Sequence, residues 1–171
     1  MKKRTSNRAH FSGSHTTRAG TVEIRPATIA DAGRIAELST QLGYPASKKE
    51  MKLRIATVAR RNDQKIFAAV VDGVIAGWLE IFRPRSVLNW GKAEIGALVV
   101  DDRYRRRGVG NALMETAHAW AKKNHCPFVY LRSNVVRSDA HKFYKRSGYT
   151  VFKTQLVFRK LFRVPRYSAQ K

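Results

Sequence analysis

Apolar residues along this chain recur with strand-like spacing in some stretches and helix-like spacing in others. Short β-branched runs at Lys65–Val71 and Val74–Phe82 predict two strands, and the Asp-Gly dipeptide between them predicts a tight hairpin. From Thr28 to Gly43 the apolar residues recur every three or four positions, which predicts a helix capped by the threonine and ended by the glycine. The pattern therefore indicates a mixture of helices and strands.

The remaining elements follow from the same two periods. They are a strand at Val22–Arg25, a helix opened by the capping box Ser47 to Glu50, a strand from Ala93, a helix from Ala112, a strand at Pro127–Leu131, a helix at Asp139–Ser147, and strands at Tyr149–Phe152 and Gln155–Leu161. This order predicts an α+β domain with a central mixed, mostly antiparallel sheet of about seven strands, flanked by about four helices.

Composition sets the limits of that domain. Residues 1–20 are basic and almost without apolar side chains, so we expect a disordered arm or the remnant of a cloning tag there. Residues 21–162 form the predicted domain, and residues 163–171 a basic tail.

Cysteine content and hydropathy exclude several classes of protein. The single cysteine, Cys126, cannot form an intrachain disulfide and leaves no cysteine cluster for zinc, so no metal is expected. No apolar run approaches the ~20 residues of a membrane span, and the N-terminus lacks the apolar segment of a secretion signal. We therefore expect a cytoplasmic protein without a membrane partner.

The stretch Glu94–Trp120 carries the candidate chemistry. An apolar strand ends at Asp101, a basic loop with two glycines follows, and a helix begins directly after it. At a helix start several backbone N–H groups lack an intrahelical partner, and glycine lets an anion come close to them. The stretch therefore predicts a phosphate-binding loop. It fits neither the Walker motif, since Gly110 is followed by Asn111, nor the dinucleotide fingerprint, since Leu113 replaces its third glycine.

Two motifs carry a resemblance to a known family. The pattern R-x-x-G-x-G at Arg105–Gly110 resembles the coenzyme A pyrophosphate loop of the GNAT acyltransferase superfamily. Asn134 after a strand, followed by A-x-x-F-Y-x-x-x-G-Y at Ala140–Tyr149, is similar to that family's second signature. The resemblance extends over about residues 22–162 and implies a single GNAT-like domain.

The resemblance implies acetyl-CoA as cosubstrate and a set of residues that bind it. The backbone of the central strand would hold the pantetheine arm and reach the acetyl oxygen, and the loop would hold the pyrophosphate. The implied residues are Leu98, Val99, Val100, Arg105, Arg106, Arg107, Gly108, Val109, Gly110, Asn111, Asn134 and Tyr144.

Acid and base roles follow from the chemistry of acetyl transfer. A phenol with a pKa near ~10 can protonate a departing thiolate, and the resemblance gives that role to Tyr144. Glu94 lies at the spacing of the catalytic glutamate in histone-type members, so it is the candidate base. Glu80 on the neighbouring strand is an alternative, and His141 is a further candidate because an imidazole can act as a general base.

Irregular segments are the expected contacts of the acceptor. They are the loop at residues 43–45 and the connection at residues 83–90, whose candidate residues are Tyr44, Arg83, Arg85 and Trp90. The two arginines suit a carboxylate or a phosphate.

The net charge of +22 is spread along the chain and bears on the partners. A basic surface attracts coenzyme A, an acidic acceptor or nucleic acid, and it repels polycations such as aminoglycosides and histone tails. The leading hypothesis is an acetyl-CoA-dependent N-acetyltransferase that acts on a primary amine of a small molecule or peptide, and the basic surface makes an anionic acceptor a candidate. Two alternatives stay open: a basic nucleic-acid or ribosome-associated protein, and a coenzyme A-binding module without catalysis. A homodimer is also left open.

Overall fold

The computed structural model describes residues 12–17, 20–89 and 91–162. The chain divides into two compact units, Met1–Arg132 and Ser133–Lys171. The first unit contains the sheet and three α-helices, and the second contains the fourth α-helix and the chain that follows it. The predicted α+β class is confirmed.

Six strands form one sheet in the order of the sequence. They are β1 (Gly13–Thr17), β2 (Gly20–Pro26), β3 (Gln64–Val71), β4 (Val74–Phe82), β5 (Ala93–Val100) and β6 (Val129–Leu131). The first five strands are antiparallel to their neighbours, and β6 is parallel to β5. The prediction of a mixed, mostly antiparallel sheet is confirmed, with six strands in place of about seven.

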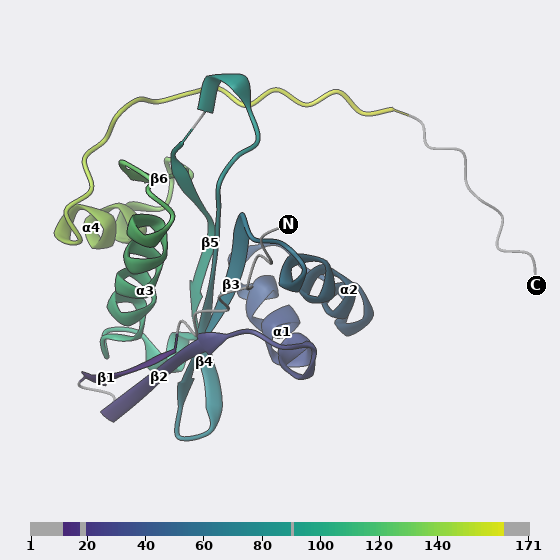
Figure 1. Ribbon diagram of the computed structural model, residues 1–171, viewed down its shortest axis with the longest axis vertical. Helices are drawn as coiled ribbons and strands as arrows, with labels where there is room; N and C mark the ends of the chain where they lie inside the picture. The colour runs from purple at the N-terminus through teal and green to yellow at the C-terminus, as the bar shows by residue number, and fades with distance from the viewer. Residues whose placement is uncertain (1–11, 18–19, 90, 163–171) are drawn as a thin grey trace, which may run out of the picture. The chain divides into compact units, whose positions relative to one another are not determined.

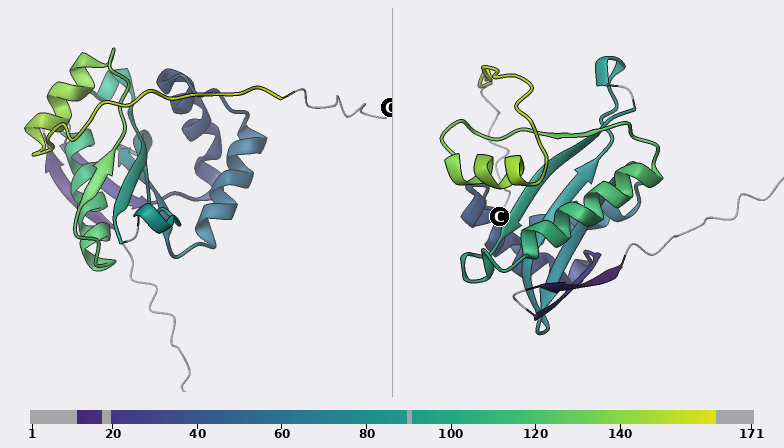
Figure 2. Two further views of the ribbon diagram at one scale, coloured as in Figure 1. Left: turned by 90° about the horizontal axis from the view of Figure 1, so that it is seen from above. Right: turned by 90° about the vertical axis from the view of Figure 1, so that its left-hand side faces the viewer.

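The helices of the first unit cover both faces of its sheet. They are α1 (Ala32–Leu42), α2 (Lys48–Ala59) and α3 (Val109–Lys123), with short 3-10 turns at Ile29–Asp31, Val87–Asn89 and Asp102–Tyr104. Helices α1 and α2 pack on one face and α3 on the other (Figures 1 and 2). The fourth helix, α4 (Ser138–Arg146), belongs to the second unit.

Local sequence signals fix the ends of these elements. The Ser47 hydroxyl accepts a hydrogen bond from the Glu50 N–H at 3.2 Å, and the Glu50 carboxylate accepts one from the Ser47 N–H at 2.8 Å, which is the predicted capping box. Helix α1 ends at Gly43, whose φ of 92° suits glycine. Asp72 and Gly73 both have positive φ, as the predicted tight hairpin requires.

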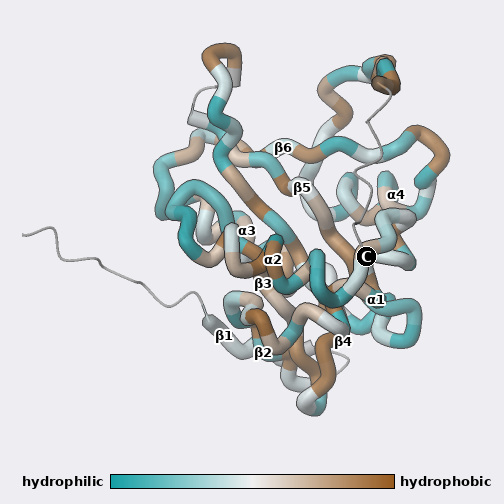
Figure 3. The backbone as a smooth tube through the Cα atoms, turned by 90° about the vertical axis from the view of Figure 1, so that its right-hand side faces the viewer, coloured by the Kyte–Doolittle hydropathy of each residue, from teal (hydrophilic) through white to brown (hydrophobic). Residues whose placement is uncertain are grey.

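Two hydrophobic layers result, one on each face of the sheet. Between the sheet and helices α1 and α2 lies a core that includes Ile35, Leu38, Ile55 and Trp78. On the other face, α3 buries its apolar side, which includes Leu113 and Trp120. Figure 3 shows the corresponding hydrophobic runs along the central strands.

The structure corrects the sequence-based prediction at both ends. Gly13–Thr17, assigned to a disordered arm, forms β1 because its backbone pairs with β2; residues 1–11 lie outside the described residues. The two final strands predicted at Tyr149–Phe152 and Gln155–Leu161 do not form, because their backbone has no ladder partner in the described part of the chain. Large apolar side chains stay exposed there, Phe152 at 90% and Val157 at 92%.

Candidate active site

One edge of β5 is open over most of its length. The parallel ladder with β6 joins only Ala93–Ile95 to Val129–Leu131, so within the part of the chain that the structure describes β5 continues from Gly96 to Val100 without a strand partner on that side. The predicted pantetheine-binding backbone of Leu98, Val99 and Val100 lies in this unpaired stretch. Its N–H and C=O groups are placed to pair with an extended ligand arm, in the way a strand is added to a sheet edge.

The basic loop leads directly from this strand to the start of α3. Gly108 is the residue before the helix and has a φ of 91°, and Arg106 has a φ of 62°. The first intrahelical hydrogen bond in this turn runs from the Ala112 N–H to the Gly108 carbonyl at 3.1 Å. The N–H groups of Val109, Gly110 and Asn111 precede that bond, so they lack carbonyl partners within the helix and suit an anion.

The three loop arginines are all exposed, and two of them have partners within the loop. Arg105 forms an ion pair with Asp102 at 2.5 Å and donates to the Val100 carbonyl at 3.3 Å. Arg107 lies 5.8 Å from the centre of the Tyr104 ring. Arg105, Arg106 and Arg107 thus place three positive charges in the residues directly before the start of α3.

A buried carboxylate anchors the loop. Asp101 is 2% exposed and accepts hydrogen bonds from the backbone and the side chain of Arg103, at 3.0 Å and 2.9 Å, and from Arg34 on α1. The Arg103 side chain, together with the Arg103 N–H and Arg34, holds the pKa of the Asp101 carboxyl well below its usual range. The loop is therefore fixed to α1 as well as to β5.

Glu94, the predicted base, is buried at the start of β5 and engages both of its carboxylate oxygens. Arg132 donates to Oε1 at 2.6 Å, and the Tyr130 hydroxyl donates to Oε2. Burial and the contact with Glu94 raise the pKa of Tyr130 to about 12, so the phenol stays protonated. Lys92 lies over the Tyr130 ring, 5.0 Å from its centre.

Glu80, the alternative base, lies on the same face of the sheet as Glu94. Glu80 is two residues from Phe82, which pairs with Glu94 across the strands, and side chains two apart share a face. Gln64 donates to Glu80 Oε1 at 2.7 Å. The ladder shifts register beside Glu80, and a Cβ added to Gly96 would lie 2.7 Å from Glu80 Oε2, so this glycine leaves room for the carboxylate.

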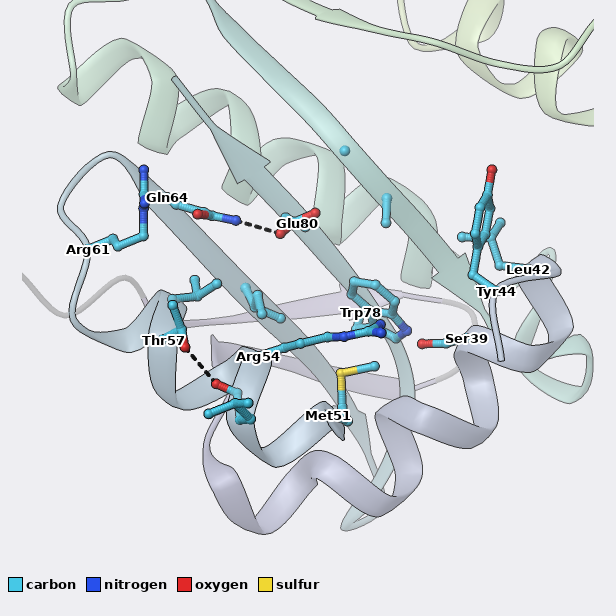
Figure 4. Close-up of a pocket in the computed structure, with 15 residues that line it drawn as sticks. Ser39, Leu42, Tyr44, Met51, Arg54, Thr57, Arg61, Gln64, Trp78 and Glu80 are labelled. Atoms are coloured by element: carbon cyan, nitrogen blue, oxygen red, sulfur yellow. Dashed lines mark hydrogen bonds between the residues drawn. The ribbon is translucent and has the colours of Figure 1, made fainter. Parts of the chain in front are cut away.

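A cleft of about 680 Å³ opens between the helices α1 and α2 and the strands β3 to β5. Its lining residues are Ser39, Leu42, Tyr44, Met51, Leu53, Arg54, Thr57, Val58, Arg61, Gln64, Ile66, Trp78, Glu80, Gly96 and Ala97. Figure 4 shows Glu80 with Gln64 in one part of the cleft and Arg54 extending toward Trp78 in another. The predicted acceptor residue Tyr44 is 70% exposed and lines the cleft.

The other predicted acceptor residues lie elsewhere. Arg85 forms an ion pair with Asp63 at 2.6 Å, and Arg61 bonds the same carboxylate at 3.0 Å and 3.1 Å. The Arg83 N–H donates to the Asp63 carbonyl at 2.8 Å, and neither Arg83 nor Arg85 lines the cleft. Trp90 lies outside the described residues.

The second unit carries Asn134 and Tyr144. The side-chain oxygen of Asn134 accepts a hydrogen bond from the Val136 N–H at 3.2 Å. The backbone carbonyl oxygen of Asn134 lies 3.0 Å from His141 Nε2. The Tyr144 ring packs edge-on against Phe143 and Tyr149, at 5.3 Å and 6.1 Å between ring centres. Burial raises the pKa of the Tyr144 phenol, which keeps its proton on the hydroxyl at neutral pH.

Comparison with known proteins identifies the family. The sequence model of the acetyltransferase (GNAT) family matches residues 33–149, which includes the open strand, the loop, the cleft and the second motif. The chain belongs to the GNAT acetyltransferase family. No group of three or more His, Cys, Asp or Glu side chains that could hold a metal lies within residues 12–17, 20–89 and 91–162 of this GNAT member, and none of the helices described there is long and apolar enough to cross a membrane.

Curated relatives match parts of this GNAT chain. An uncharacterised N-acetyltransferase of Methanocaldococcus jannaschii is 31% identical over 113 residues, which are 62% of this chain and 48% of the relative. An uncharacterised N-acetyltransferase of Bacillus subtilis is 39% identical over 79 residues, 45% of this chain and 54% of the relative. The chain thus spans about half the length of these curated relatives.

Solved structures share the fold of this GNAT member. The aminoglycoside acetyltransferase AAC(6')-Iy, in complex with a bisubstrate analogue, superposes with a TM-score of 0.73 at 17% identity, over 82% of this chain and 99% of that one. A transcriptional regulator from Bacillus halodurans superposes with a TM-score of 0.72 at 19% identity, over 81% and 99% of the two chains. At such low identity the likeness concerns the fold.

Several residues of this GNAT site were missed from the sequence. Three of them line the cleft, namely Arg54, Gln64 and Trp78. The fourth, Arg34, bonds Asp101 at the start of the basic loop. The sequence showed no functional signal in the helices and strands that carry them. Gly96 offered a usable signal, since a glycine inside a strand pattern often marks a bulge.

Proposed function

We propose that this protein transfers the acetyl group of acetyl-CoA to a primary amine. The observation that carries the proposal is the open edge of β5 beside the start of α3, where unpaired strand backbone and unpaired helix N–H groups lie next to each other in a member of the GNAT family. In this proposal the backbone of Leu98–Val100 binds the pantetheine arm. The N–H groups of Val109, Gly110 and Asn111, with Arg105 to Arg107 around them, bind the pyrophosphate.

The transfer needs a neutral amine, a polarised carbonyl and a protonated leaving group. The amine gives up a proton to a carboxylate, its nitrogen forms a bond to the thioester carbonyl carbon, and the C–S bond breaks. A backbone N–H of the open strand edge stabilises the charge on the carbonyl oxygen. The hydroxyl of Tyr144, which burial keeps protonated at neutral pH by raising its pKa, gives its proton to the departing thiolate and regains one from solvent after product release. Asn134 contributes its side-chain amide, whose nitrogen is a donor, to the pantetheine.

We assign the acceptance of the amine proton to Glu80 in preference to Glu94. Both oxygens of Glu94 are engaged by Tyr130 and Arg132, whereas Glu80 lines the cleft and only its Oε1 makes a hydrogen bond within the described part of the chain. Glu94 stays the alternative base. The pH–rate profiles of Glu80→Gln and Glu94→Gln distinguish the two candidate bases. Only the variant that lacks the true base should lose the fall in rate on the acidic side of the profile.

Binding of acetyl-CoA tests the proposal directly. We expect the wild-type protein to bind acetyl-CoA in isothermal titration calorimetry and to release free CoA thiol when an amine panel is added. Gly108→Asp should abolish binding, because it places a side chain and a negative charge where the pyrophosphate lies. Gly73→Asp is the matched control, since Gly73 also has positive φ but lies in the β3–β4 hairpin, outside both motifs. Equal acetyl-CoA affinity in wild type and Gly108→Asp contradicts the proposal.

A further inference from the structure

The cleft combines an apolar wall with opposite charges. Leu42, Met51, Val58, Ile66, Trp78 and Ala97 supply the apolar surface. Glu80 is the one carboxylate among the described residues that line it, and Arg54 and Arg61 are the two cations. A volume of about 680 Å³ is in the range of small-molecule sites.

The Glu80 carboxylate has one oxygen left for a ligand. Gln64 fixes Oε1 at 2.7 Å and so orients the group, while Oε2 makes no hydrogen bond within residues 12–17, 20–89 and 91–162. A Cβ at Gly96 would lie 2.7 Å from Oε2, so the glycine leaves the room that this oxygen occupies at the wall of the cleft. A half-buried carboxylate oxygen with no donor suits an ammonium or amine N–H.

The two arginines of the cleft differ in what they can offer. Arg61 already makes two hydrogen bonds to Asp63. Arg54 forms no ion pair within 4.0 Å in the described part of the chain, and Figure 4 shows it extending over the cleft toward Trp78. Its guanidinium is thus available for an anionic group of a ligand, and its planar donors match a carboxylate.

We propose that the acceptor is a zwitterion, an amino acid-like molecule with one amine, one carboxylate and an apolar body. This inference rests on the acetyltransferase function proposed above. The amine binds Glu80, the carboxylate binds Arg54, and the apolar body packs against Trp78 and Met51. A polycation fits poorly, because Glu80 is the one carboxylate among the described residues that line the cleft and the chain as a whole carries a net charge of +22. The charges of the cleft therefore disfavour an aminoglycoside as acceptor, although an aminoglycoside acetyltransferase shares the fold.

Matched acceptors test the inference. L-phenylalanine and phenethylamine share the amine and the aromatic body and differ by the carboxylate, and sisomicin supplies a polycation. With wild-type protein we expect kcat/KM for phenylalanine to exceed that for phenethylamine at least tenfold, and sisomicin to be the poorest acceptor. Arg54→Gln should bring the first ratio to within about twofold by lowering only the phenylalanine value, since the variant removes the charged hydrogen bond to the carboxylate that distinguishes the two acceptors.

A second arginine variant serves as the control for Arg54→Gln. Arg60→Gln removes a charge from the exposed end of the same helix, outside the cleft, and should leave the ratio unchanged. A wild-type preference for phenethylamine or sisomicin, or an equal loss for both small acceptors in Arg54→Gln, overturns the inference while leaving the acetyltransferase proposal intact. If no acceptor turns over, a thermal shift by phenylalanine in the presence of CoA, lost in Arg54→Gln, supports the inference, and no shift overturns it. Failure to bind acetyl-CoA overturns the proposed function first.

Discussion

Arg34 on α1 forms an ion pair with Asp101 at the end of β5, although 67 positions separate the two residues in the sequence. Arg34 also donates to the Ile75 carbonyl at 3.3 Å and to Glu37 at 2.8 Å. Asp101 in turn caps the 3-10 turn that begins the basic loop. Through these contacts α1, which lines the cleft, holds the loop proposed to bind the pyrophosphate.

Replacing Asp101 should therefore weaken both the fold and the loop. Asp101→Asn leaves Arg34 and Arg103 without their carboxylate and should lower the free energy of unfolding by about 3 kcal/mol. Urea denaturation measures that change, and calorimetry should show weaker acetyl-CoA binding. Asp102→Asn is the control. Its partner Arg105 and Asp102 itself are 57% and 66% exposed, and loss of such a surface pair should change stability by less than about 1 kcal/mol.

The same carboxylate predicts the direction of acid sensitivity. Because Arg103 and Arg34 lower the pKa of Asp101 in the folded protein, its contribution to stability is fully present above the ordinary carboxyl pKa of about 3.9 and is lost as the pH falls below it. We expect the free energy of unfolding to decline below pH 4 in the wild type and less steeply in Asp101→Asn. Unfolding curves from pH 2 to pH 7 measure the two slopes, and parallel slopes contradict the assignment.

Local signals in the sequence predicted much of the fold. The capping box at Ser47 and the Asp72-Gly73 turn fix elements through contacts within four residues, so neighbouring letters suffice to find them. The basic loop at Arg105–Gly110 is likewise contiguous in the sequence. The cleft is different, because Gln64, Trp78 and Ala97 meet there only through strand register. The apolar run Leu156–Phe158 within Gln155–Leu161 predicts a strand, but a strand also needs a paired backbone, which the residues of one segment cannot supply.

Arg132 and Glu94 should respond unequally to substitution. The Arg132 side chain is 72% exposed and that of Glu94 is 5% exposed. Arg132→Met leaves a buried carboxylate with only Tyr130 as donor and should lower the free energy of unfolding by about 2 kcal/mol, whereas Glu94→Gln leaves a solvated arginine and should lower it by about 1 kcal/mol. Chemical denaturation of both variants measures the order. The reverse order shows that the pair does not hold Glu94 in place.

Tyr144→Phe should reduce turnover while cofactor binding persists. In the proposed mechanism the phenol protonates the thiolate, and loss of such a general acid lowers kcat by about a hundredfold. Since burial raises the pKa of Tyr144, the protonated donor persists through neutral pH, and any loss of rate from its ionisation should appear only above about pH 10. Rate measurements over a range of pH give the change in kcat, and isothermal titration calorimetry gives the acetyl-CoA affinity. Tyr149→Phe is the control, and loss of binding in Tyr144→Phe points to a structural role.

Trp78 is expected to tolerate loss of its indole nitrogen. It is 8% exposed on β4, and its Nε1 is the one buried side-chain polar atom without a hydrogen-bond partner among the described residues. Trp78→Phe loses apolar contact but also removes a buried unpaired donor, which by itself costs about 1–3 kcal/mol. The free energy of unfolding should therefore change by less than about 1 kcal/mol.

Trp120→Phe is the matched comparison for that variant. Trp120 is 1% exposed on α3 and is not among the buried atoms without partners, so its substitution removes packing without any such relief. We expect it to lower the free energy of unfolding by about 2 kcal/mol. Urea titration measures the free energy of unfolding of both variants. If Trp78→Phe is as destabilising as Trp120→Phe, burial of the Trp78 N–H costs nothing, and this group has a hydrogen-bond acceptor in the folded protein in solution.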